Sequence, residues 1–146
     1  GTVSQPVDFP DLEAFAQNNY SKELDDLSCV IDWVHKTHQT NSVIDVETIF
    51  LIGHSRGGGI VTIKASEDDR IKKVITLAGV SDYKSRFPQG DALVQWQKEG
   101  VYHVENKRTR QQMPHYIQFY EDFIENEERL TIKRAVENLS ISHDRN

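Results

Sequence analysis

The stretch TIFLIGHSRGGGIV, residues 48–61, decides the fold class of this chain. Residues 48–52 form a nearly continuous apolar run without polar alternation, which is typical of a parallel strand buried on both faces. A helix is expected to begin near residue 60, and a second apolar run follows at 74–79. The roughly 20 residues between the two runs are enough for a crossover helix between parallel strands. The sequence therefore predicts a βαβ unit in an α/β fold.

The turn after the first predicted strand carries the pattern G-x-S-x-G, as Gly53, Ser55 and Gly57. This pattern is typical of a nucleophile elbow, a sharp strand-to-helix turn that presents a serine hydroxyl. The residues two before and two after the serine approach each other closely, so side chains at 53 and 57 are expected to collide. The main-chain N–H of Arg56, at the helix start, can donate to a developing oxyanion. We therefore predict Ser55 as the nucleophile and Arg56 as an oxyanion donor.

Two other interpretations of this turn remain open at this point. One is a glycine-rich strand-to-helix turn in which the serine is incidental. The other is a phosphate-binding loop, although the lysine and hydroxyl pair that closes such a loop is missing. The strand directly before the turn and the second strand at crossover distance favour the elbow.

The rest of the sequence predicts helices on both sides of this unit. Residues 1–20 are expected to be irregular, and Ser21 is a candidate N-cap for a helix that runs to about residue 38. Further helices are predicted at 92–98, from Pro114 onward and around 132–139, and residues 101–104 alternate weakly, as a locally paired strand does. We expect a single partial domain over 1–146, with 83–130 as a cap or lid insertion.

Large side chains in the expected cap have two alternative roles. They can line a pocket for an acyl or alcohol group, or they can form the small core of the cap itself. The side chains concerned are Trp96, Tyr102, Met113, Tyr116 and Tyr120.

Composition and charge exclude several classes of partner and site. A net charge of −6 disfavours nucleic acid or an anionic membrane as the main partner, because either requires a basic surface. No apolar run approaches the roughly 18 residues of a membrane span, and no basic-then-apolar leader opens the chain. The single cysteine, Cys29, excludes an internal disulfide and favours a reducing, cytoplasmic location. His35 and His38 lie three apart on a predicted helix without a further ligand, so no metal site is expected.

The sequence resembles the α/β-hydrolases, in particular the bacterial dienelactone-hydrolase-like and peptidase-like serine esterases. The similar segments are "DLEAF…SKELDDL…VIDW", "IFLIGHSRGGGIV", "IKKVITLAGVSDYKSRFP" and "RTRQQMPHYIQFYEDF". The resemblance implies that Ser55 is the nucleophile and that the N–H of Arg56 is one oxyanion donor. Dienelactone hydrolase itself has cysteine at the position of Ser55, so the resemblance implies a serine esterase. It implies neither a metal nor an organic cofactor.

The resemblance also implies that parts of the fold lie outside these residues. Relatives have more strands than the two identified here, an earlier oxyanion loop, and an acid and a histidine on late strand ends. Residues 140–142 are expected to begin the next strand. The order serine, acid, histidine is satisfied within the chain by Ser55, Asp82 and His143. The alternative for Asp82 is a turn or cap residue.

These observations predict a serine hydrolase that acts on small-molecule esters or related acyl substrates. The alternative is a non-catalytic binding or scaffold piece that retains the elbow. The 146-residue chain by itself is expected to be inactive and poorly stable.

Overall fold

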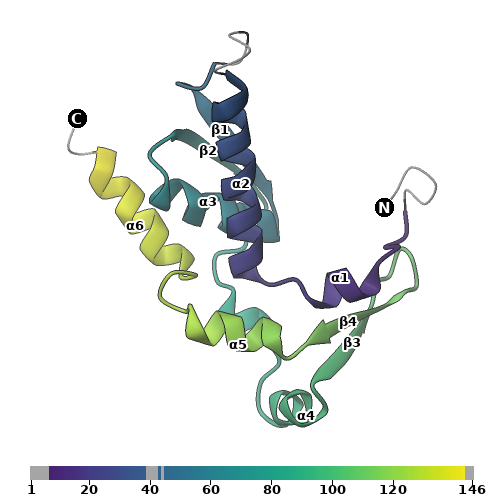
Figure 1. The fold of residues 1–146 in the computed structure, drawn as a ribbon. Helices are drawn as coiled ribbons and strands as arrows, with labels where there is room; N and C mark the ends of the chain where they lie inside the picture. The colour runs from purple at the N-terminus through teal and green to yellow at the C-terminus, as the bar shows by residue number, and fades with distance from the viewer. Residues whose placement is uncertain (1–6, 39–42, 44, 144–146) are drawn as a thin grey trace. The chain divides into compact units, whose positions relative to one another are not determined.

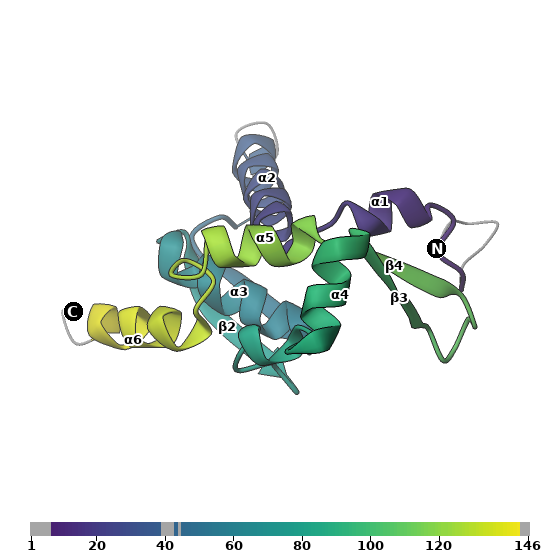
Figure 2. The same ribbon diagram turned by 90° about the horizontal axis from the view of Figure 1, so that it is seen from below.

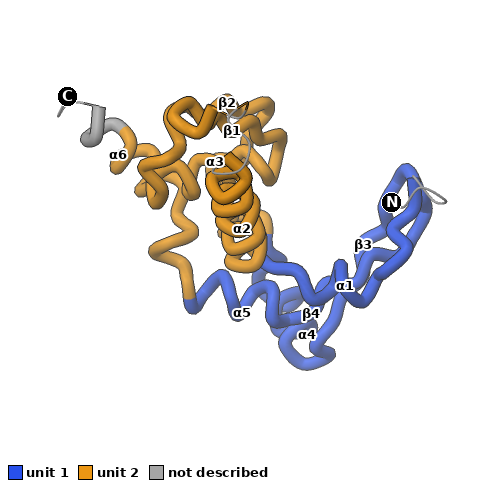
Figure 3. The backbone as a smooth tube through the Cα atoms, turned by 45° about the horizontal axis from the view of Figure 1, so that its top comes forward, with its two compact units in different colours: residues 1–19, 87–125 blue, residues 20–86, 126–146 orange. Residues whose placement is uncertain are grey.

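A computed structural model describes residues 7–38, 43 and 45–143, with the backbone alone for 140–143 (Figure 1). The chain divides into two compact units (Figure 3), which are described separately. Unit 1 takes its described residues from 7–19 and 87–125, and unit 2 takes them from 20–86 and 126–143. The elements in chain order are α1 (Leu12–Ala16), α2 (Tyr20–His38), β1 (Ile49–His54), α3 (Arg56–Glu67), β2 (Ile71–Leu77), the 3₁₀ helix η1 (Lys84–Arg86), α4 (Asp91–Glu99), β3 (Val101–Glu105), β4 (Gln112–Tyr116), α5 (Gln118–Glu125) and α6 (Ile132–His143).

Unit 2 contains the predicted βαβ unit. β1 and β2 pair in parallel, from Ile49 opposite Ile71 to His54 opposite Leu77, with one irregularity next to Ile49. α3 connects them, so the predicted crossover is confirmed. The predicted helix that ends near residue 38 is also confirmed, as α2, but α2 begins at Tyr20, so the prediction of Ser21 as its N-cap is wrong.

The core of unit 2 lies on one face of this sheet, between the strands and the helices α2, α3 and α6 (Figures 1 and 2). It combines three buried residues with five partly buried apolar side chains: Ile31, Ala65 and Ile71, with Leu27, Ile49, Leu51, Val74 and Leu139.

The opposite face of the sheet is open among the described residues. Its apolar side chains are between 49% and 65% exposed: Phe50, Ile52, Ile75 and Leu77. The prediction of strands buried on both faces is therefore wrong for this chain. A continuous apolar run is typical of a strand that packs against other elements on both faces. The described helices pack against only one face of this sheet.

Unit 1 is built on an antiparallel hairpin of β3 and β4, in register from Val101 opposite Tyr116 to Glu105 opposite Gln112. The predicted local pairing of 101–104 is therefore confirmed. α1 packs on β4, and Gln111 exchanges two hydrogen bonds of 2.9 Å with the main chain of Phe9. Part of the segment predicted to be irregular is thus a helix, and the sequence had not placed it beside the hairpin. Of the predicted cap, residues 83–130, unit 1 holds 87–125.

Several predicted boundaries are wrong. α3 begins at Arg56 and not near residue 60, and β2 spans Ile71–Leu77 and not 74–79. Pro114 lies in β4, opposite His103, and the next helix begins at Gln118. Proline suits the first turn of a helix, but it is also accepted on an edge strand, where its missing N–H is not needed. Residues 140–142 continue α6 instead of starting a strand. Extending a helix that has already formed costs little, because each added residue gains one hydrogen bond.

Candidate active site

Ser55 lies at the turn between β1 and α3, and its backbone has φ of 52° and ψ of −118°. Positive φ is uncommon for a residue with a side chain and costs of order 1–3 kcal/mol. The residue is exposed, and its side chain makes no capping hydrogen bond to α3. The strained turn thus presents the Ser55 hydroxyl at the carboxyl end of a parallel strand.

Main-chain hydrogen bonds hold this turn against the segment that follows β2. The N–H of Ser55 donates to the carbonyl of Leu77 at 3.0 Å. The Ser55 carbonyl accepts from the N–H groups of Gly58 and Val80, both at 3.0 Å. The strain at Ser55 is therefore maintained by partners on α3 and beyond β2.

The steric argument for the two elbow glycines holds at Gly53 and is wrong at Gly57. A Cβ on Gly53 would lie 2.3 Å from the carbonyl oxygen of Gly57, too close for any side chain. A Cβ on Gly57 would meet nothing within 4 Å, because that position points into open space. The pattern predicted the close approach correctly, but only the backbone of Gly57 takes part in it.

Two further glycines, which the G-x-S-x-G pattern does not include, are also required at the turn. A Cβ on Gly58 would lie 2.8 Å from the Cα of Gly79, where α3 crosses the chain after β2. A Cβ on Gly59 would lie 2.3 Å from the hydroxyl oxygen of Tyr83. The run of three glycines after Arg56 was the signal, and its second and third members carry the packing.

Arg56 is the first residue of α3, so its N–H lies at the positive end of the helix dipole. Its guanidinium pairs with Glu23 at 2.7 Å and lies 4.5 Å from the ring centroid of Tyr20. Its carbonyl accepts a hydrogen bond of 2.6 Å from the hydroxyl of Tyr83. Glu23 lies 33 residues before Arg56, so no local sequence pattern predicts this pair.

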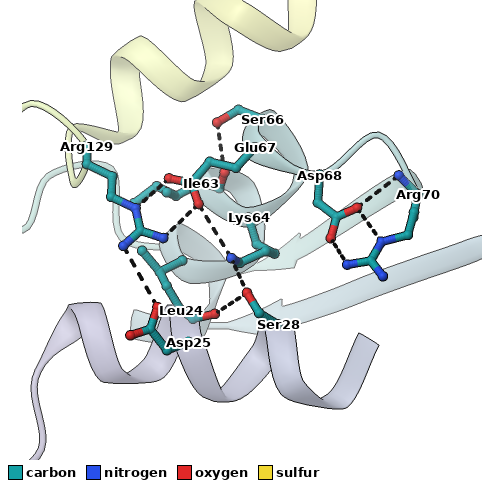
Figure 4. A network of polar contacts seen from close by, with 10 residues as sticks. All are labelled: Leu24, Asp25, Ser28, Ile63, Lys64, Ser66, Glu67, Asp68, Arg70 and Arg129. Atoms are coloured by element: carbon teal, nitrogen blue, oxygen red, sulfur yellow. Dashed lines mark hydrogen bonds and ion pairs between the residues drawn. The ribbon is translucent and has the colours of Figure 1, made fainter. Parts of the chain in front are cut away.

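A buried lysine ties α3 to α2 (Figure 4). Lys64 is 4% exposed, and its ammonium donates to the Ser28 hydroxyl at 2.6 Å and lies 3.4 Å from a carboxylate oxygen of Glu67. Arg129 donates to both oxygens of Glu67, at 2.7 and 3.0 Å. Burial alone favours a higher pKa for Glu67, but Arg129 and Lys64 outweigh it and lower that pKa. The helix behind Ser55 is thus anchored by charge as well as by packing.

Asp82 caps the turn that leads into η1. Its carboxylate accepts from the N–H groups of Lys84 and Ser85, at 2.9 and 3.2 Å. Partial burial favours a higher pKa for Asp82, but these hydrogen bonds outweigh it and hold the pKa below its ordinary value. This geometry matches the turn or cap alternative for Asp82.

The histidine candidate is not placed by the structure. His143 is the last residue of α6, and its side chain lies outside the described residues. No contact that joins Asp82 to Ser55 or to a histidine is found among the residues described. No three histidine, cysteine, aspartate or glutamate side chains in that same part of the chain are grouped so as to hold a metal ion.

Two of the five large side chains of the expected cap are buried in the core of unit 1, and the other three are half-buried: Tyr102, Tyr116 and Tyr120. Trp96 is 1% exposed and donates its indole N–H to the carbonyl of His115 at 2.9 Å, and Met113 is also buried. Tyr116 donates its hydroxyl to Glu13 at 2.6 Å. Trp96 and Tyr102 also line an open hollow of about 220 Å³, together with Pro88, Ala92, Gln95, Glu99 and Val101.

None of the described helices is both long and apolar enough to cross a lipid bilayer.

The comparison with protein families identifies the chain. Residues 16–142 match the family described as alpha/beta hydrolase fold. This range includes β1, β2, the turn at Ser55 and most of unit 1. Comparison with curated proteins returns no match. The described residues contain the βαβ unit of a partial α/β-hydrolase fold. The chain therefore belongs to the α/β-hydrolase family.

Proposed function

We propose that this chain is the nucleophile-bearing part of a serine hydrolase that acts on esters or related acyl substrates. The observation that carries the proposal is the exposed Ser55 at positive φ, between a parallel strand and the start of α3. A residue that only connected a strand to a helix would not need this strain. This geometry supports the proposal of a nucleophile on a strand-to-helix turn.

In the proposed reaction, the Ser55 oxygen attacks the substrate carbonyl carbon while its proton passes to a histidine oriented by an acid. The N–H of Arg56 stabilises the negative oxygen of the tetrahedral intermediate. The alcohol then leaves with the proton, and water releases the acyl group from Ser55. Because Asp82 caps a turn, we propose that the acid and the histidine come from outside residues 1–146.

The finer assignments follow from the residue at the elbow and from composition. Serine at position 55 supports a serine esterase related to the dienelactone-hydrolase-like branch. A net charge of −6 supports a small-molecule acyl substrate in preference to nucleic acid or a membrane. The single cysteine supports a cytoplasmic location. We also propose that residues 83–130 act as a cap inserted into a single hydrolase domain.

The direct test is covalent labelling of the full-length protein with a fluorophosphonate probe. We expect one labelled serine, at Ser55, and hydrolysis of p-nitrophenyl acetate that falls to background in Ser55→Ala. Ser81→Ala is the matched control, because Ser81 is an exposed serine on the loop after β2 and should leave both measurements unchanged. Labelling at another serine, or turnover that survives in Ser55→Ala, would overturn the assignment. A protein that takes up no label would support the non-catalytic alternative.

A further inference from the structure

The residue proposed as oxyanion donor is held by a buried tyrosine from the segment that follows β2. The Tyr83 hydroxyl donates to the Arg56 carbonyl at 2.6 Å, and Tyr83 is only 2% exposed. Burial, followed by the nearby Tyr20 and Glu23, raises the pKa of Tyr83 well above its ordinary value. The phenol therefore stays neutral and keeps its proton for this hydrogen bond.

The sequence of α3 leaves room for that hydroxyl. Gly59 lies three residues after Arg56, and any Cβ there would come within 2.3 Å of the Tyr83 oxygen. The Tyr83 ring also stacks on Tyr20, with centroids 3.9 Å apart and planes 21° apart. Tyr83 is thus fixed both at its ring and at its hydroxyl.

Tyr20, which stacks on Tyr83, also restrains the Arg56 side chain. The guanidinium lies over the Tyr20 ring at 4.5 Å and pairs with Glu23 at 2.7 Å. A cation over an aromatic ring and an ion pair together restrict the rotamers of a long side chain. Arg56 is therefore held through its carbonyl by Tyr83 and through its guanidinium by α2.

The two peptide planes that flank the Arg56 Cα are both anchored. The carbonyl of the first plane belongs to Ser55 and accepts from Gly58 and Val80. The carbonyl of the second plane belongs to Arg56 and accepts from Tyr83. The Arg56 N–H lies in the first plane, opposite the Ser55 carbonyl, and a fixed second plane limits rotation of the first about the Arg56 φ. The Arg56 carbonyl also begins the hydrogen-bond ladder of α3, so losing Tyr83 would loosen the second plane without freeing it completely.

We propose that Tyr83 is a positioning residue, whose hydroxyl keeps the Arg56 N–H directed at the oxyanion formed on Ser55. This inference rests on the proposed function. It predicts that Tyr83 affects the stabilisation of the tetrahedral intermediate and does not affect the binding of the ground-state ester. Pre-aligned donors are effective because they need no reorganisation when charge develops.

The test is Tyr83→Phe in the full-length protein, which keeps the ring and its stacking and removes only the hydroxyl. With p-nitrophenyl acetate we expect kcat to fall about tenfold and KM to stay within twofold, since complete loss of one donor costs roughly 10²–10³. Benzeneboronic acid forms a tetrahedral adduct on serine, so its inhibition constant should rise by a similar factor. The fraction of molecules that fluorophosphonate finally labels should stay the same, although labelling becomes slower.

Thr62→Val is the matched control. The Thr62 hydroxyl donates to the Gly58 carbonyl at 2.8 Å inside α3, and Thr62 lies six residues after Arg56. The change removes a buried hydrogen bond of similar kind, so stability should fall comparably while kcat and the boronate constant stay within twofold.

The outcomes separate this inference from the function on which it rests. If Ser55→Ala is inactive but Tyr83→Phe retains wild-type kcat and boronate affinity, the positioning role is wrong and the nucleophile stands. If Tyr83→Phe only lowers the labelled fraction, or if Thr62→Val has the same kinetic effect, the role of Tyr83 is structural and the inference is overturned. If the wild-type protein takes up no label at Ser55, the proposed function fails and the inference fails with it.

Discussion

A Cβ on Gly53 would lie 2.3 Å from the carbonyl oxygen of Gly57, whereas a Cβ on Gly57 would meet nothing within 4 Å. The relationship between the two glycines is one-sided. Gly53, at the end of β1, must lack a side chain because α3 begins against it. Gly57 contributes a carbonyl oxygen to the contact and has a helical conformation that other residues share.

Substitution by alanine should therefore affect these two positions in opposite directions. Gly53→Ala forces the turn to move and should destabilise the protein by about 1–3 kcal/mol, the usual cost of overpacking. Gly57→Ala should be neutral or should stabilise by up to about 1 kcal/mol, because alanine restricts the unfolded chain and favours helix. Urea unfolding of the full-length protein measures both changes.

The two glycine variants serve as controls for each other. Equal loss of stability in both would show that the close approach is mutual and would contradict the geometry at Gly57. A stable Gly53→Ala variant would show that β1 and α3 are further apart than described here.

The turn between α3 and β2 contains an ion pair that should make stability depend on pH in the acidic range. Asp68 accepts two side-chain hydrogen bonds from Arg70, at 2.8 and 2.7 Å (Figure 4). These bonds lower the pKa of Asp68 below its ordinary value of 3.8, with partial burial opposing them. Because the folded pKa is the lower one, the pair stabilises the fold above about pH 4 and loses this contribution as pH falls through the folded pKa.

Asp68→Asn should therefore flatten the loss of stability on acidification. We expect the variant to be less stable than the wild type at pH 7 by under about 1 kcal/mol, because the pair is partly exposed to solvent. The difference in the free energy of unfolding between Asp68→Asn and the wild type should narrow as the pH approaches 3. Urea unfolding at pH 7, 5, 4 and 3 measures it. Asp69→Asn removes the adjacent exposed carboxylate, and its difference in stability from the wild type should not narrow as the pH falls. An equal pH dependence in the two variants would rule out the pair of Asp68 and Arg70 as the cause.

Helices and strands could be predicted where a local pattern of apolar residues determines them. They could not be predicted where their packing partners lie far away in the sequence. β1, β2 and the helices between and before them follow from apolar runs and helical spacing, which are local signals. α1 contains only five residues and depends on β4, about 100 residues later, for its packing. No local pattern carries that information. Pro114 was misplaced for a different reason, since proline is accepted both at a helix start and on an edge strand.

The residues of the candidate site also fall into those that could be predicted from the sequence and those that could not. Ser55 and Gly53 could be predicted because a sharp turn imposes residue types at fixed spacing. Tyr83 and Gly59 could not, because their requirement arises only when the segment after β2 crosses α3. The burial of Lys64 could not be predicted either, because its hydrogen-bond partner Ser28 lies on another helix.

The exposed face of the βαβ sheet gives the last prediction. Ile52 and Leu77 are 65% and 54% exposed there, and Phe50 and Ile75 lie beside them. Contiguous apolar surface of this kind promotes association, and a two-stranded sheet with open edges is marginally stable in water. Residues 1–146 produced alone should therefore associate, melt without a sharp transition and show no esterase turnover. Size-exclusion chromatography with light scattering, together with thermal melting, measures this behaviour.

Polar substitution on that face should reverse the association. Ile52→Thr with Leu77→Thr places a β-branched residue, which suits a strand, at both positions while it removes much of the apolar surface, so the monomer fraction should rise severalfold. Val94→Thr is the control, because Val94 is 63% exposed on α4 in unit 1 and lies outside the sheet. The sheet face is the cause only if the double variant restores the monomer and Val94→Thr does not. A wild-type chain that is already monomeric, with a cooperative melt, would show that the open face does not need cover.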